Sequence, residues 1–317
     1  MPISPSSCLR IAAVFMLLPG QVMAAEGGIG TYLLGMNGPS AAVTPDPGWY
    51  FRNDIFYYSG SIGRGRDLPM NGRFSFGVDG SAFLAIPTLI YVTPVEIAGG
   101  RLGFTASLPI GRKNVDVAYS VQGPRGGTAA GAESDGRNTL GDPKLGAFLG
   151  WNQGYWHYQL GSQINVPVGD YDNSRLANIS FNRWSLDVIG ALTWLNPETG
   201  VDLSGTLGMT LNDENPDTKY RTGTELHFEA AAVQHFNRQF DAGVIGYHYE
   251  QVSSDSGDGA VSGFRGRVTA LGVTAGYNVM INQRPVAMRV KYLKEFNARN
   301  RAEGDALYLT LTVPLGG

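Results

Sequence analysis

Three ionisable residues, Glu225, His227 and Glu229, alternate along one stretch of the chain. Side chains of a β-strand alternate between its two faces, so these three would share one face. Carboxylate and imidazole groups gathered in this way could bind a metal ion. The same pattern arises on any strand that turns polar side chains into a protein interior. The sequence favours this second interpretation, and we predict no metal site and no cofactor.

Nucleophilic catalysis would need a serine within hydrogen-bonding reach of a histidine, with a third group orienting that histidine. The candidate residues are the four histidines and two serines on strands expected nearby: His157, His227, His235, His248, Ser185 and Ser204. The G-x-S-x-G pattern of many hydrolases is missing from the sequence. Polar residues also face inwards in a barrel whether or not they react. We therefore predict no catalytic residue and no enzyme activity.

The charge balance excludes one class of partner. The 317 residues include 24 Lys and Arg against 27 Asp and Glu, a formal net charge of −3. A nucleic-acid-binding protein usually carries a basic surface, so no nucleic acid is expected as a partner. The single cysteine, Cys8, lies before the apolar stretch near the start of the chain, so we expect no disulfide in the exported protein.

The first 24 residues look like a secretory signal peptide. Arg10 precedes a short apolar stretch, residues 11–18, and small residues stand at positions suited to cleavage after Ala24 or Ala25. The stretch is too short to span a membrane as an anchor. Residues 25–48 are rich in Gly, Pro and small side chains. We interpret them as an N-terminal periplasmic segment or a partial plug.

Residues 183–194, R-W-S-L-D-V-I-G-A-L-T-W, show the pattern that must position these side chains. One alternate set is apolar and has a tryptophan at each end, Trp184 and Trp194. The other set includes Arg183 and Asp187. A tilted strand of about ten residues matches the apolar band of roughly 25 Å that outer-membrane barrels present to lipid, with aromatic girdles at its edges.

The pattern repeats along residues 49–317 and predicts an all-β fold, a transmembrane antiparallel up-and-down β-barrel of twelve strands. The expected strands are residues 49–58, 83–93, 101–109, 142–151, 155–166, 183–194, 201–211, 222–236, 240–251, 267–279, 286–296 and 305–314. Long and short connections alternate between them, with residues 59–81 and 110–141 expected as long loops. Short periplasmic turns and long outer loops are typical of these barrels and predict two periplasmic termini.

The alternation also assigns side chains to the two faces of the barrel. The residues expected to line the lumen, as channel candidates, are Arg52, Asp54, Lys144, His157, Gln159, Arg183, Asp187, Asp202, Glu225, His227, Glu229, His248, Glu250, Arg289, Lys291 and Glu295. Those expected in the membrane girdles are Trp151, Trp156, Trp184, Trp194 and Tyr277. The luminal set could form a self-satisfied network that closes a narrow barrel, or an aqueous or substrate path.

Several motifs resemble a known family. They are L-G-D-P-K-L at 140–145, N-V-P-V-G-D-Y-D at 165–172, N-I-S-F-N-R-W-S at 178–185, T-L-N-D-E-N-P-D-T-K-Y-R-T-G at 210–223, Q-V-S-S-D-S-G-D-G at 251–259, K-Y-L-K-E-F-N-A-R-N-R-A-E-G-D at 291–305 and P-D-P-G-W-Y at 45–50. The chain resembles the family known as MetA-pathway of phenol degradation, or SphA-like, of outer-membrane proteins. The resemblance implies an outer-membrane barrel and a role in uptake of hydrophobic or aromatic compounds. It implies no catalytic residues.

We therefore expect a channel in the bacterial outer membrane for passive uptake of small hydrophobic or aromatic compounds. The expected partners are outer-membrane lipid, these solutes and the barrel-assembly machinery, and the oligomeric state stays open. The alternative is a closed barrel with a structural or adhesive role, or a barrel hydrolase.

Overall fold

The computed structural model describes residues 29–68, 72–122, 128–260, 263, 265–282 and 284–316. The predicted signal peptide, residues 1–24, lies outside them. Across these ranges no helix is long and apolar enough to cross a membrane. The strands are β1 Gly48–Leu68, β2 Gly72–Ile97, β3 Gly100–Ser107, β4 Ile110–Gln122, β5 Thr128–Leu140, β6 Lys144–Gln153, β7 Trp156–Asn165, β8 Ser185–Asn196, β9 Val201–Asn212, β10 Tyr220–Arg221, β11 Glu225–His235, β12 Phe240–Gln251, β13 Ser256–Gly257, β14 Arg267–Ile281, β15 Arg284–Arg299 and β16 Glu303–Gly316.

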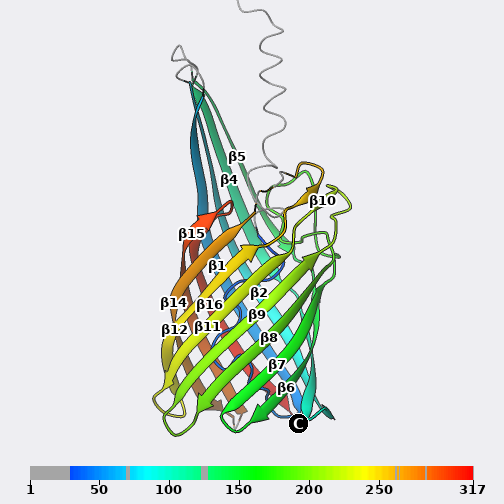
Figure 1. Ribbon diagram of the computed structural model, residues 1–317, viewed down its shortest axis with the longest axis vertical. Helices are drawn as coiled ribbons and strands as arrows, with labels where there is room; N and C mark the ends of the chain where they lie inside the picture. Colours follow the sequence, from blue (N-terminus) through cyan, green and yellow to red (C-terminus); the bar gives the residue numbers. More distant parts are fainter. Residues whose placement is uncertain are drawn as a thin grey trace, which may run out of the picture.

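Twelve antiparallel strands close into one barrel (Figure 1). Their order is β1, β16, β15, β14, β12, β11, β9, β8, β7, β6, β3, β2, and β2 pairs again with β1. Closure leaves no open sheet edge, as a lipid environment requires, because backbone groups there find no water to bond. The prediction of an all-β barrel of twelve strands is confirmed.

Strand β9 shows why these residues form barrel strands. Asp202, Ser204 and Thr206 are buried on the inner face, while Leu203 and Leu207 on the outer face are about half exposed. Apolar side chains outside and polar side chains inside are what a lipid-facing strand needs. The neighbouring strand β8 pairs with β9 in continuous register from Ser185 to Asn196, so the same division continues around the wall.

Residues 59–81 and 110–141 were predicted to be long loops, and this prediction is wrong: most of these residues form β-strands. Strands β1 and β2 continue far past the barrel, and the hairpin β4–β5 pairs with the upper part of β2. Together these strands form an extension that rises above one side of the barrel (Figure 1). Its stretches are rich in Gly, Ser and Asp, and its apolar residues Ile62, Val78 and Val115 gather in one small cluster. Backbone pairing along β1, β2, β4 and β5 builds this sheet.

The barrel interior is polar on one side and apolar on another. An apolar cluster inside it includes Phe56, Ile245, Tyr247, Leu293 and Tyr308. These residues come from β1, β12, β15 and β16, whose inner faces therefore depart from the polar-inside pattern. Leu34, which precedes β1, packs on this apolar surface and helps to bury it.

The two ends of the barrel differ. The C-terminal strand reaches Gly316 beside Trp49, at the end where the short turns lie (Figure 1). One of these turns contains Gly154, whose φ of 60° suits a residue without a Cβ atom. The opposite end carries the long connections and the extension. In an outer-membrane barrel this long-loop end faces the exterior. The prediction of two periplasmic termini stays a prediction, and Thr31, near the described start, contacts Ser185 at the long-loop end.

Candidate functional site

Residues 29–47, called here the luminal segment, run through the barrel from one end to the other. Near the long-loop end, Ser185 Oγ donates to Thr31 Oγ1 over 2.8 Å. Near the short-turn end, Ser40 Oγ donates to Asp202 Oδ2 over 2.7 Å, and Thr44 N donates to Asn152 Oδ1 over 3.3 Å. The luminal segment therefore contacts the inner wall at both ends of the barrel.

The middle of the luminal segment is held by one carboxylate of the wall. Glu229 Oε1 accepts hydrogen bonds from the Tyr32 hydroxyl at 2.9 Å and from Gly35 N at 2.8 Å. Glu229 is buried, so these bonds replace the water that a carboxylate would otherwise need. A buried carboxylate accepting a backbone N–H is among the stronger hydrogen bonds in proteins.

A lysine of β15 holds the same turn from the other side. Lys291 Nζ donates to the carbonyl oxygens of Gly35, Met36 and Asn37 at 2.5, 2.8 and 3.2 Å. The ammonium also lies 4.5 Å from the ring centroid of Tyr308. Three carbonyls and an aromatic face together satisfy a buried cation that has no water around it. Lys291 is thus the main cationic anchor of the luminal segment.

His227 packs against the luminal segment and bonds to the wall. Its ring stacks on Tyr32 with centroids 3.6 Å apart. Its Nε2 lies 2.9 Å from Asp187 Oδ1, which also accepts the Thr210 hydroxyl at 2.8 Å. The bond to Asp187, which Thr210 holds in turn, fixes the ring's orientation, so this side chain acts as a platform for Tyr32.

Replacement of Lys291 by methionine is expected to loosen the luminal segment. Three carbonyls would lose a charged donor at once, at a cost of about 3 kcal/mol, which corresponds to roughly a hundredfold faster amide exchange at residues 33–37. Hydrogen exchange followed by mass spectrometry measures this exchange rate. Lys294→Met is the matched control, because Lys294 lies on the same strand but faces outwards beside Asp305. Equal exchange in the two variants would contradict the anchor role.

The structure places most of the predicted luminal residues inwards. The side chains that alternate with exposed outer residues, or that bond within the lumen, are Arg52, Asp54, Lys144, His157, Gln159, Arg183, Asp187, Asp202, Glu225, His227, Glu229, Arg289, Lys291 and Glu295. Several form pairs within the wall. Arg52 Nε lies 2.7 Å from Asp54 Oδ2, and Arg289 Nη1 lies 2.8 Å from Asp241 Oδ1.

The prediction of a luminal position is wrong for two residues, His248 and Glu250. On β12 the buried inner face carries Ile245, Tyr247 and Tyr249, so His248 and Glu250 point outwards. The alternation is reversed here because the inner tyrosines find carboxylate acceptors on other strands: the Tyr247 hydroxyl donates to Glu295 Oε1 and the Tyr249 hydroxyl to Glu225 Oε1. Aromatic residues with a polar tip can serve either face.

The predicted girdle residues lie on the outer wall. Trp156 and Trp194 are cross-strand partners close to the short-turn end, and Trp151 is on the neighbouring strand there. Tyr277 pairs with Phe240 at the same end, whereas Trp184 precedes β8 at the opposite end. Their amphipathic rings suit the boundary between lipid tails and water.

The serine–histidine and metal hypotheses find no geometric support. Ser185 bonds to Thr31, and Ser204 bonds to Asp202 and Thr193. In the part of the chain that the structure describes, no hydrogen bond joins either serine to a histidine. Among all the residues that the structure describes, there is no group of three or more His, Cys, Asp or Glu able to bind a metal ion.

An apolar chamber lies beside the luminal segment, towards the long-loop end. Its volume is about 180 Å³. The walls are mainly aliphatic and aromatic side chains, among them Leu34, Phe56, Ile62, Val78, Leu84 and Ile86. Polar groups at its edge include the ammonium groups of Lys113 and Lys144 and the amide of Gln163. A concave apolar space with a few polar groups is the usual form of a small-molecule site.

The two lysines at the chamber are held by backbone carbonyls. Lys113 Nζ donates to Asn178 O at 3.2 Å, and Lys144 Nζ donates to Thr31 O. Within the described residues, neither lysine forms an ion pair with a carboxylate. Each ammonium has three N–H donors, so each retains donors for a ligand. Lys113 was not predicted from the sequence, because it lies in the stretch expected to be a loop.

The connection between β7 and β8 covers this chamber, and one buried carboxylate shapes it. Asp142 accepts hydrogen bonds from Asn165 Nδ2 at 3.0 Å, Gly169 N at 3.0 Å, Ser180 Oγ at 2.6 Å and Phe181 N at 2.8 Å. Four donors from both ends of residues 165–181 converge on it, so it closes the connection into a compact loop. Asp142 was not among the predicted site residues.

The extension braces the same loop from outside. Asp135 of β5 accepts the backbone N–H groups of Leu176 and Ala177 and pairs with Arg175 at 2.5 Å. The Ala177 N–H and the Arg175 guanidinium favour the ionised form and lower the pKa of the Asp135 carboxyl. Ala177 also packs on an apolar cluster of the extension that includes Ile62, Val78 and Val115.

The chain is similar in fold to a solved outer-membrane channel. An outer membrane channel from Pseudomonas putida F1 superimposes with a TM-score of 0.65 at 15% identity, over 87% of this chain and 98% of that one. The transport unit of the autotransporter AIDA-I from Escherichia coli gives a TM-score of 0.42 at 12% identity, over 92% of this chain and 95% of that one. The chain matches no curated protein.

The fold of the first neighbour is that of an outer-membrane barrel, which agrees with the lipid-facing wall found here. At family level the match is broad. Residues 64–311, most of the barrel, fit the sequence profile of a single family. The chain belongs to the family described as "Putative MetA-pathway of phenol degradation".

Proposed function

We propose that this protein is an outer-membrane channel for passive uptake of small hydrophobic or aromatic compounds. The observation that carries the proposal is the apolar chamber inside the barrel. A channel for ions or sugars would have a wetted, polar path. A chamber walled by Leu34, Phe56 and Ile86 instead favours an apolar solute over water.

The size of the chamber suggests the size of the solute. An apolar cavity of about 150 Å³ is enough to bind one benzene ring. The chamber, at about 180 Å³, would accept a single substituted ring. Lys113 and Lys144 would donate to a phenolic hydroxyl or another oxygen on that ring, which fits the phenol degradation in the family's description.

The luminal segment would then act as a partial plug between the chamber and the periplasmic end. It crosses the lumen and is held there by hydrogen bonds to the wall, so diffusion of a solute past it would require the segment to shift. Passive flow needs no energy source at the membrane, because consumption of the solute inside the cell maintains its gradient.

Narrowing the chamber is expected to slow uptake. Ala82→Phe would place a ring in the chamber from β2, since Ala82 lines it. We expect the initial uptake of a labelled phenol at limiting concentration to fall about tenfold. Ala106→Phe is the control, because Ala106 of β3 is exposed on the outer wall. Full uptake by Ala82→Phe, with the protein present at normal levels, would refute the chamber as the route.

The dense contacts of the luminal segment also favour a second function, a closed barrel with a structural or adhesive role. Deletion of the gene distinguishes the two. A transport role predicts slower growth on low concentrations of an aromatic carbon source, whereas a structural role predicts a weaker envelope or reduced attachment with unchanged uptake.

A further inference from the structure

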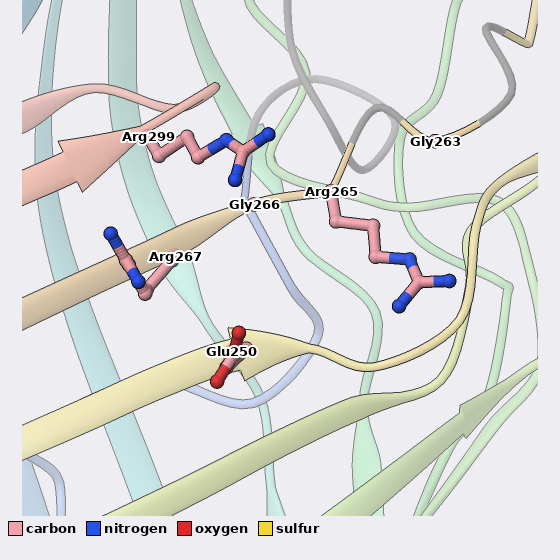
Figure 2. A pocket seen from close by; sticks show the side chains of 6 residues that line it. All are labelled: Glu250, Gly263, Arg265, Gly266, Arg267 and Arg299. Carbon is pink, nitrogen blue, oxygen red and sulfur yellow. The ribbon is translucent and has the colours of Figure 1, made fainter.

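Three arginines gather on the outer face of the barrel at its long-loop end. Arg267 begins β14, and Arg299 ends β15 directly opposite it in the strand pairing. Arg265 lies two residues before β14. Figure 2 shows these three side chains with Glu250 around the backbone of Gly266. The residues line a cavity of about 290 Å³.

This cavity lies outside the lumen. Val268, the next residue of β14, is fully buried inside the barrel, so Arg267 faces outwards. Further along the same outer face, Leu271 and Val273 are exposed apolar residues of the lipid-facing band. Arg267 is four residues from Leu271, or about 13 Å along the strand. The arginines therefore lie at the level where lipid headgroups begin.

The charges in the cluster are unbalanced. Three guanidinium groups face one carboxylate, that of Glu250, which lies 3.9 Å from His248. Within the described residues, none of the three arginines forms an ion pair. Arg267 Nε is buried without a hydrogen-bond partner. A buried guanidinium N–H without an acceptor is costly, and a bound anion would remove that cost.

We propose that Arg265, Arg267 and Arg299 form a binding site for the phosphate groups of a lipid headgroup in the outer leaflet. The planar fork of a guanidinium matches the oxygens of a phosphate, which can accept two parallel hydrogen bonds from it. Arginines on two adjacent strands and the preceding loop could hold two phosphates of one glycolipid. The outer leaflet of outer membranes contains such phosphorylated glycolipid, and the long-loop end faces it. The proposal does not depend on what the barrel transports.

The site can be tested with the full chain in nanodiscs. We would measure binding of diphosphorylated lipid A and of its dephosphorylated form by native mass spectrometry. The unaltered protein is expected to prefer the diphosphorylated lipid about tenfold, and the double variant Arg267→Gln, Arg299→Gln to lose this preference. Arg284→Gln is the matched control, because Arg284 is an exposed arginine at the other end of β15. It is expected to behave like the unaltered protein.

A second variant keeps the test decisive if the double variant folds poorly. Arg265→Gln changes an exposed residue outside the strands and is expected to lower the preference severalfold. Equal binding of both lipids by the unaltered protein, or an unchanged preference in Arg265→Gln and in the double variant, would overturn the proposal. Displacement of the lipid by millimolar inorganic phosphate would also overturn it, because the site would then take free phosphate rather than a headgroup.

Discussion

Replacement of Asp142 by alanine is expected to release residues 166–184 from their compact loop over the chamber. Asp142 is a buried carboxylate that accepts hydrogen bonds from Asn165, Gly169, Ser180 and Phe181. Alanine would leave all four donors without this acceptor. A loss of about 3 kcal/mol or more follows, because hydrogen bonds to a charged group are the stronger ones. Amide exchange at residues 169 and 181 should accelerate by roughly two orders of magnitude.

The same variant should alter digestion of the folded protein. Arg175 lies in the loop and is bound to Asp135, so trypsin is expected to cleave after it readily only once the loop opens. Asp142→Asn is the control for shape, because an amide oxygen can still accept some of the four bonds. An intermediate effect is expected for it. Protection equal to that of the unaltered protein in Asp142→Ala would show that the apolar packing of Ala177, rather than the carboxylate, holds the loop.

Removal of residues 31–44 is expected to open the lumen. The luminal segment runs from Ser185 at one end to Asn152 at the other and occupies the space between. A twelve-stranded barrel without it would have a continuous aqueous path, and single-channel conductance should rise roughly tenfold. Planar-bilayer recording measures it. The strand pairing that closes the barrel does not involve the segment, so the barrel is expected to assemble.

A cross-linked variant provides the matched control. Ala42 N lies 3.1 Å from Thr193 Oγ1, so Ala42→Cys with Thr193→Cys can tether the segment to the wall. The sequence holds one cysteine, Cys8, within the predicted signal peptide. The oxidised pair should conduct like the unaltered protein and transport more slowly until reduced. If the deletion left conductance unchanged, side chains of the wall, and not the segment, would close the barrel.

The barrel strands could be predicted because lipid acts on each strand separately. A lipid-facing residue must be apolar wherever it stands, so strands such as β8 and β9 carry an alternating pattern that can be seen without knowing their partners. The extension could not be predicted in this way. Strands β4 and β5 lie above the lipid, where both faces can be polar, and their pairing depends on the long strand β2 beside them.

The sequence was least informative about the inner face. His248 and Glu250 are polar yet face outwards. The inner positions are taken by Tyr247 and Tyr249, whose hydroxyls donate hydrogen bonds to carboxylates inside the barrel. Lipid constrains only the outer residues between the headgroup layers. The residue type at an inner position depends on what that side chain contacts in the lumen. Asp142 and Lys113 gave no signal either, since each acts on a loop or segment that is distant in the chain.

By itself the sequence determined a twelve-stranded outer-membrane barrel and its family. The membrane imposes the same rule on every strand, and a local rule is visible in a local pattern. Only the tertiary structure decided that residues 29–47 run through the lumen, that an apolar chamber lies beside them and that three arginines meet outside. These features join residues far apart in the chain, such as Lys291 with Gly35 and Arg267 with Arg299. Such contacts depend on how strands pair and on which segment enters the lumen, and they leave no periodic trace in the sequence.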